Sequence, residues 1–159
     1  MTKKPATVRE EIRQTKPFRS VAEEAILTLY RTADAIQRDF AQLIEPHGIS
    51  SQQYNVLRIL RGAGAEGLPT LEIADRMVER TPGITRLLDK LETKRLVRRL
   101  RCPEDRRQVL CYITEPGLQV LAQLDQPALE MGVRTMRALT TPELRRLIAL
   151  LNQVRAGLS

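Results

Sequence analysis

The stretch TPGITRLLDKLETKRLVRRLRCPEDRRQVLCYIT, residues 81–114, changes its hydrophobic period halfway along. Up to about Lys94 its apolar residues recur every three or four positions, which is the spacing of an amphipathic helix. From Leu96 the period becomes two, and after a charged link it is two again from Val109 to Ile113. Two alternating runs around a turn-rich link predict a β-hairpin. The sequence therefore predicts a helix that leads directly into a hairpin.

The start and the two faces of this helix can be assigned from its residues. Thr81 is expected to cap the helix and Pro82 to occupy its first position, where the missing N–H of proline costs nothing. At about 100° per residue the apolar residues form one stripe, which is expected to pack into a small core. The stripe consists of Ile84, Leu87, Leu88 and Leu91, and the opposite face carries Thr85, Arg86, Asp89 and Lys90.

Two short helices are predicted before this one. Ser50 and Gln53 have the spacing of a capping box, in which side chains satisfy the first free amides of a helix, here expected to end at Gly62. The glycine-rich segment GAGAEGLP follows, and Thr70 is expected to cap the next helix. Three short helices and a hairpin are the order of a winged helix-turn-helix, whose last helix enters the major groove of DNA.

Long amphipathic helices are predicted on both sides of this region. One extends from Arg19 to Glu45, a second follows Thr114 and is expected to kink at Pro127, and a third starts at residues 140–143. Their apolar surface exceeds what the small central core can cover. A homodimer interface would bury the surplus, and a monomeric helical cap is the alternative.

Basic residues concentrate in the middle of the chain. The chain of 159 residues has a formal charge of +7 and a pI near 10.0, which favours an anionic partner such as nucleic acid, a membrane surface or an acidic protein. Between Arg76 and Arg107 eleven Lys and Arg face five Asp and Glu, so this stretch carries +6 of that charge. No apolar run approaches the roughly 18 residues of a membrane span. We therefore expect a soluble cytoplasmic protein that binds no membrane.

The predicted helix 82–94 offers groups that suit DNA. Arg86 can bind guanine with two hydrogen bonds, while Thr85 and Lys90 add a methyl-bearing hydroxyl and a second cation. A helix that is merely solvated would also turn polar residues outward, but the basic hairpin that follows favours the DNA interpretation. Ser50, Ser51 and Thr70, at the starts of the two preceding helices, are candidates for phosphate contacts, or are caps and nothing more.

Residues 81–114 closely resemble the recognition helix and wing of the MarR family of bacterial transcriptional regulators. The DRR at 105–107 and the apolar strand that ends at Ile113 are the most specific part of the resemblance. Upstream, ISSQQYNVLRIL at 49–60 resembles the family's second helix. The resemblance covers about residues 19–157. It implies a homodimer that binds a pseudo-palindromic operator in double-stranded DNA and is often released by a small, commonly aromatic, effector or by cysteine oxidation.

The resemblance also implies roles for individual residues. Positions around the start of the recognition helix would meet bases and nearby phosphates, and the wing would pair an acid with an arginine that enters the minor groove. These positions are Thr81, Pro82, Gly83, Thr85 and Arg86 in the helix and Asp105 and Arg107 in the wing, with Lys90 and Arg106 as further basic candidates. The family usually has glycine where this chain has Arg95. If the helix ends in a left-handed cap there, arginine in place of glycine would cost about 1 kcal/mol of stability.

Together these features predict a mainly α fold with a small β-hairpin. Residues 1–18 are expected to form a flexible arm, 19–46 a dimerisation helix, 47–114 the winged helix-turn-helix, and 115–159 the C-terminal dimerisation helices. Non-specific coating of DNA by a basic helical module, or binding of an acidic protein, is the alternative function.

An effector would be expected between the dimerisation helices and the DNA-binding lobe. His47, Tyr54 and Arg58 are the candidates there, although His47 also suits a Pro-His-Gly turn and Tyr54 also suits a core position.

An enzyme is not expected, because one histidine and two cysteines form no convincing triad or metal set, and no cofactor is expected. If the hairpin folds about residues 104–105, Cys102 lies opposite Arg107 and Cys111 opposite Arg98, so the two thiols are not partners.

Overall fold

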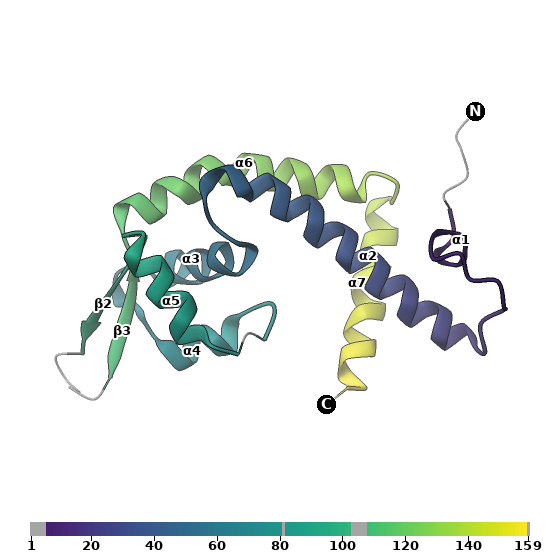
Figure 1. Ribbon diagram of the computed structural model, residues 1–159, viewed down its shortest axis with the longest axis horizontal. Helices are drawn as coiled ribbons and strands as arrows, with labels where there is room; N and C mark the ends of the chain where they lie inside the picture. The colour runs from purple at the N-terminus through teal and green to yellow at the C-terminus, as the bar shows by residue number, and fades with distance from the viewer. Residues whose placement is uncertain (1–5, 81, 103–107, 159) are drawn as a thin grey trace. The chain divides into compact units, whose positions relative to one another are not determined.

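The computed structural model describes residues 6–80, 82–102 and 108–158, which form two compact units, residues 1–42 and 43–159 (Figure 1). Four of the candidate DNA-binding residues, Thr81, Asp105, Arg106 and Arg107, lie outside the described residues. The fold is mainly helical with a small antiparallel sheet, as predicted.

The first unit consists of a short helix, α1 (Val8–Glu11), and most of a long one, α2 (Val21–Ile44). Thr7 caps α1 through a capping box, and Arg31 of α2 donates to Glu11 at 2.9 Å. The observed α2 matches the helix that the periodicity predicts over 19–45, whereas the sequence did not predict α1. The last turn of α2 enters the second unit, where Ile44 is fully buried.

The second unit contains the winged helix-turn-helix and the two C-terminal helices. The elements, in order after the 3₁₀ turn η1 (Glu45–His47), are α3 (Ser51–Ala63), η2 (Gly64–Glu66), β1 (Leu68–Pro69), α4 (Thr70–Arg76), α5 (Ile84–Thr93), β2 (Val97–Arg101), β3 (Val109–Ile113), α6 (Glu115–Met136) and α7 (Thr141–Ala156). Thr114 caps α6 by accepting from the amide of Gly117 at 3.2 Å. None of the described helices is long and apolar enough to cross a membrane.

The sheet differs from a plain hairpin in two respects. It has three strands in the order β1-β3-β2, because the two residues of β1 pair with β3. The register of the hairpin is shifted by one from the predicted one: Arg99, not Arg98, lies opposite Cys111. Cys102 accordingly lies opposite Gln108 rather than Arg107, with its amide 2.8 Å from the Gln108 carbonyl. Each residue of β3 therefore pairs one position further along β2 than the sequence predicted.

The core of the second unit joins the helix-turn-helix to the sheet and to α6. Helices α3 and α6 contact each other, and α5 contacts α3, α4 and β2. The largest fully buried side chains are Ile44, Val56, Leu57, Leu60, Ile73, Leu88, Leu91, Val97, Cys111, Leu121 and Leu124. Because α5 is fixed on its apolar side, its polar side is left facing away from the core.

Two helix starts were predicted wrongly. Helix α4 is preceded by an extended Pro69, so Thr70 is its first residue and not its cap, and its hydroxyl lies 3.9 Å from Cys111 Sγ. The pairing of β1 with β3 holds Pro69 extended and thereby sets this start. Helix α5 begins at Ile84 rather than Pro82, because Gly83 has φ 93°, outside the helical range.

Candidate nucleic-acid interface

Helix α5 has the two faces that its sequence predicts. Leu87, Leu88 and Leu91 are buried, and Ile84 is half-buried. Thr85, Arg86, Asp89 and Lys90 are exposed on the other side. The helix therefore presents two cations, a hydroxyl and a carboxylate to its surroundings.

The entry into α5 is exposed. Pro82 and Gly83 are both exposed, and Gly83 is in the left-handed region, which L side chains rarely adopt. Its carbonyl accepts the first helical hydrogen bond from Leu87 at 3.2 Å. Among the described residues no side chain caps the helix, and the first amides of a helix have no partner within it.

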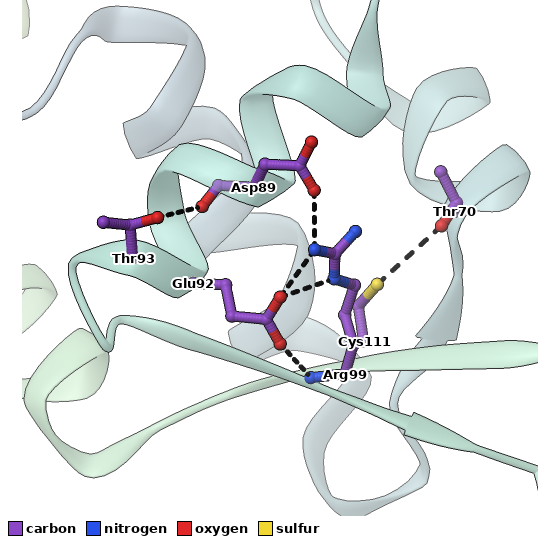
Figure 2. Close-up of polar contacts among 6 residues, drawn as sticks. All are labelled: Thr70, Asp89, Glu92, Thr93, Arg99 and Cys111. Atoms are coloured by element: carbon purple, nitrogen blue, oxygen red, sulfur yellow. Dashed lines mark hydrogen bonds and ion pairs between the residues drawn. The ribbon is translucent and has the colours of Figure 1, made fainter.

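An arginine from the wing binds two acids of α5 (Figure 2). Arg99 of β2 donates through Nη2 to Asp89 Oδ1 at 2.6 Å and to Glu92 Oε2 at 2.5 Å, and through Nε to Glu92 Oε2 at 2.9 Å. The hydrogen bond with Glu92, followed by that with Asp89, raises the pKa of Arg99, while partial burial opposes the rise. This cluster could not be predicted from periodicity, because it depends on how β2 packs against α5.

The start of α3 is fixed by the predicted capping box. The amide of Gln53 donates to Ser50 Oγ at 3.2 Å, and the amide of Ser50 donates to Gln53 Oε1 at 3.1 Å. Lys94, just after α5, donates to the same Gln53 oxygen at 3.3 Å and to the carbonyl of Gly48. Ser50 is exposed and Ser51 half-buried. The start of α3 is thus connected to the end of α5.

The wing strands add basic side chains to the same region. Arg98 and Arg101 of β2 are exposed, and the Arg98 guanidinium lies 5.2 Å from the centre of the Tyr112 ring on β3. That ring covers Gly67, where an added Cβ would lie 2.6 Å from Tyr112 Cε1. The residue before β1 therefore lies directly against the Tyr112 ring of β3.

Two of the three effector candidates lie together on α3. Tyr54 is 6% exposed, so its ring belongs to the core, and the Arg58 guanidinium lies 5.9 Å from the ring centre. Arg61, one turn later, binds Asp125 of α6 through both nitrogens at 2.8 and 2.9 Å. His47 is half-buried at the end of η1.

The two cysteines are free thiols in different surroundings. Cys111 is fully buried, and burial raises the pKa of its thiol. Cys102 is half-buried beyond the end of β2. Within residues 6–80, 82–102 and 108–158 no cluster of His, Cys, Asp and Glu is arranged to hold a metal ion.

The chain resembles known proteins in both sequence and structure. Residues 49–109 match the model of the MarR family. The HTH-type transcriptional regulator TtmR of Methylorubrum extorquens is 32% identical over 136 residues, which cover 86% of this chain and 68% of that protein.

Solved structures show the same likeness. A MarR transcription factor from Planctomyces limnophilus is 40% identical with a TM-score of 0.66, covering 86% of this chain and 99% of that one. A mutant MarR from E. coli complexed with operator DNA is 27% identical with a TM-score of 0.72, covering 79% and 89% of the two chains. This chain therefore belongs to the MarR family, and it is a transcriptional regulator that binds DNA through a winged helix-turn-helix.

Proposed function

We propose that this protein is a repressor that binds a pseudo-palindromic operator as a homodimer and is released by a small effector. The observation that carries the proposal is the exposed face of α5, where Arg86 and Lys90 stand one turn apart beside a basic wing. Such a helix fits the major groove, whose width admits an α-helix. We propose that the protein acts in the cytoplasm, where its operator DNA would lie.

The contacts divide into those that read bases and those that hold the backbone. Arg86 is proposed to bind guanine with two hydrogen bonds, and Thr85 to contact a neighbouring base. Phosphate contacts supply affinity without sequence information. For these we propose Pro82, Gly83 and Lys90 of the α5 region, Ser50 and Ser51 of α3, the first amide of α4 at Thr70, and Thr81.

The wing is proposed to enter the minor groove through Arg107, with Arg106 close to the backbone. This proposal comes from the sequence resemblance alone. A carboxylate at Asp105 would accept from the guanidinium two residues on and fix its direction. An arginine held this way loses less side-chain entropy on entering a narrow, negative groove.

A homodimer is supported by apolar side chains that the single chain leaves exposed on its long helices. Helix α2 carries Val21, Ile26, Leu29 and Tyr30, α6 carries Leu129 and Val133, and α7 carries Ile148, Leu150 and Val154. Burying such a surface between two copies would remove it from water. Two-fold symmetry would also place two recognition helices about one DNA turn apart, which suits a palindromic site.

The effector is proposed to bind near Tyr54 and Arg58, where α3 meets α6, with His47 as a further contact. An aromatic carboxylate would suit this place, because Arg58 and Arg61 bring positive charge beside an aromatic ring. Such a ligand would compete with Asp125 for the arginines and so alter the packing of α3 on α6.

The experiment that tests the proposal is selection of random duplexes by the protein, followed by sequencing. We expect one pseudo-palindromic site; recovery of unrelated sequences would instead identify a non-specific DNA-coating protein. Arg86→Ala should relax the base preference at one position in each half-site, whereas Arg107→Ala should weaken binding with less loss of preference except at flanking A·T steps. Repeating the selection with aromatic acids and with peroxide tests the effector.

A further inference from the structure

A carboxylate lies in the middle of the exposed face of α5. At about 100° per residue, Asp89 projects between Thr85 on one side and Arg86 on the other, with Lys90 beyond Arg86. The Asp89 side chain is 53% exposed, so its charge is not hidden in the core. A face that approaches phosphates would be repelled by an uncompensated carboxylate at its centre.

Arg99 compensates this charge from the wing side of the helix. Figure 2 shows its guanidinium extending from β2 to α5, where Nη2 lies 2.6 Å from Asp89 Oδ1. The Arg99 side chain is 24% exposed against 53% for Asp89, so the arginine is the more buried partner of the pair. The bond therefore draws Asp89 toward the strand.

Glu92 sets the direction of that guanidinium. Its Oε2 accepts from Nε and Nη2 of Arg99, and its Oε1 accepts from the Arg99 backbone amide at 3.2 Å. Three hydrogen bonds to one carboxylate fix both the strand residue and its side chain. Glu92 thus holds the guanidinium in an orientation in which Nη2 also donates to Asp89 Oδ1.

We propose that Arg99 is a positioning residue for DNA recognition: anchored by Glu92, it neutralises Asp89 and turns that carboxylate from the exposed face of α5 toward β2. Without it, Asp89 would pair with Arg86, three residues earlier on the same helix, and compete with DNA for that cation. The inference rests on the proposed role of the α5 face. It assigns a function to a wing residue without requiring that residue to contact DNA.

A double-mutant cycle tests the proposal with the duplex recovered in the selection. Arg99→Ala should weaken binding by at least about tenfold, whereas Asp89→Asn alone should stay within about threefold of the unchanged protein. When Asp89→Asn is added to Arg99→Ala, it should raise DNA affinity by a factor at least about threefold larger than its effect in the otherwise unchanged protein. Equal effects in the two backgrounds would mean that Arg99 acts only as a phosphate contact or through stability, and would overturn the proposal.

Base preference is the second readout. Selection with the Asp89→Asn protein should return the same operator, because a carboxylate that is turned toward β2 does not read a base. Loss of a cytosine preference at one position would show that Asp89 accepts from the cytosine amino group, and this would also overturn the proposal.

Controls separate this inference from its premise. Arg38→Ala removes the same charge from an exposed pair with Asp34 on α2, and should leave affinity within about twofold. Circular dichroism at the assay temperature checks that each variant is folded. If Arg99→Ala is unfolded, Arg99→Lys replaces it, because lysine keeps the positive charge but cannot donate two parallel hydrogen bonds. Arg99→Lys should bind DNA with intermediate affinity, and adding Asp89→Asn should raise that affinity. If Arg86→Ala leaves DNA affinity and base preference unchanged, the proposed role of α5 is wrong. If Arg86→Ala changes them but Arg99→Ala does not change affinity, only the inference about Arg99 is wrong.

Discussion

Arg61 of α3 and Asp125 of α6 form a two-pronged ion pair, with Nη1–Oδ2 at 2.8 Å and Nη2–Oδ1 at 2.9 Å. Such paired geometry is directional, since two parallel hydrogen bonds fix the planes of both groups. The pair therefore joins the helix-turn-helix to the first long C-terminal helix at one defined orientation. It also lies next to the proposed effector site at Arg58.

Breaking this pair should reduce stability only modestly. The side chains are 34% and 49% exposed, so solvent screens the charges and Asp125→Asn should lower the free energy of unfolding by about 0.5–1 kcal/mol at pH 7. Urea denaturation measures the difference. Asp34→Asn, which breaks the exposed pair with Arg38 within one helix, should cost no more than about 0.5 kcal/mol. A loss as large at Asp34 as at Asp125 would contradict the joining role.

The same pair predicts a pH dependence with a definite sign. The hydrogen bond from Arg61 lowers the pKa of Asp125 below its usual 3.8. A lowered pKa in the folded state means that the stabilisation is present above that usual value and is lost as the pH falls below it. The stability difference between the unchanged protein and Asp125→Asn should therefore be constant near neutral pH and shrink in acid. A difference that grows in acid would contradict this assignment.

Arg95 adopts the left-handed conformation that glycine usually provides after the recognition helix. Its φ is 60°, and this costs a residue with a side chain about 1 kcal/mol. Arg95→Gly should therefore raise the free energy of unfolding by about 0.5–1 kcal/mol in urea denaturation. Thr93→Gly is the matched control, because Thr93 is the last helical residue of α5 and glycine there should destabilise by a few tenths to 1 kcal/mol. Equal changes at both positions would exclude a backbone origin.

The helix faces of α5 could be predicted from sequence because they depend only on the helical period. The apolar stripe correctly predicted that Leu87, Leu88 and Leu91 are buried. The helical spacing also predicted that Arg86 and Lys90 are exposed on the opposite face. Arg95 does adopt the left-handed conformation for which the family pattern favours glycine, and its cost of about 1 kcal/mol stays a prediction.

Features that depend on strand pairing could not be predicted in this way. The short strand β1 contains only Leu68 and Pro69, too few residues to show a period, yet its pairing with β3 sets the start of α4. The hairpin register depends on the geometry of its loop, so the fold point assumed between residues 104 and 105 placed Arg98 opposite Cys111, one residue out of register. The Arg99–Asp89 pair depends on how β2 packs against α5, which the periodicity of either segment alone does not show. Whether Asp105 aims Arg107 remains a prediction.

Two helical glycines differ in the space around them and give a matched pair of variants. An added Cβ at Gly117 would meet the backbone carbonyl of Leu96 and lie 2.8 Å from Ile113 Cγ1, whereas at Gly62 it would meet nothing within 4 Å. Gly62→Ala should stabilise the protein by about 0.5–1 kcal/mol through helix propensity. Gly117→Ala should instead destabilise it by at least about 1 kcal/mol, because a backbone neighbour cannot move aside cheaply. Thermal and urea unfolding of both variants check the opposite signs; stabilisation by Gly117→Ala would show that the approach of α6 to the sheet is looser.

The homodimer proposal predicts that a single charge on a long C-terminal helix abolishes association. Val133 on α6 and Ile148 on α7 are 66% and 58% exposed in the single chain. If a partner covers them, Val133→Asp or Ile148→Asp would bury an unpaired carboxylate in the interface. The free-energy cost of that burial should exceed the free energy of dimer association. Sedimentation equilibrium should show a dimer for the unchanged protein and monomers for these variants, with helical circular dichroism preserved. Leu71→Asp is the control: Leu71 is 78% exposed on α4 of the DNA-binding lobe, so that variant should stay dimeric. If the unchanged protein is a monomer, the homodimer proposal is wrong. If both aspartate variants remain dimeric, the interface lies elsewhere on the chain.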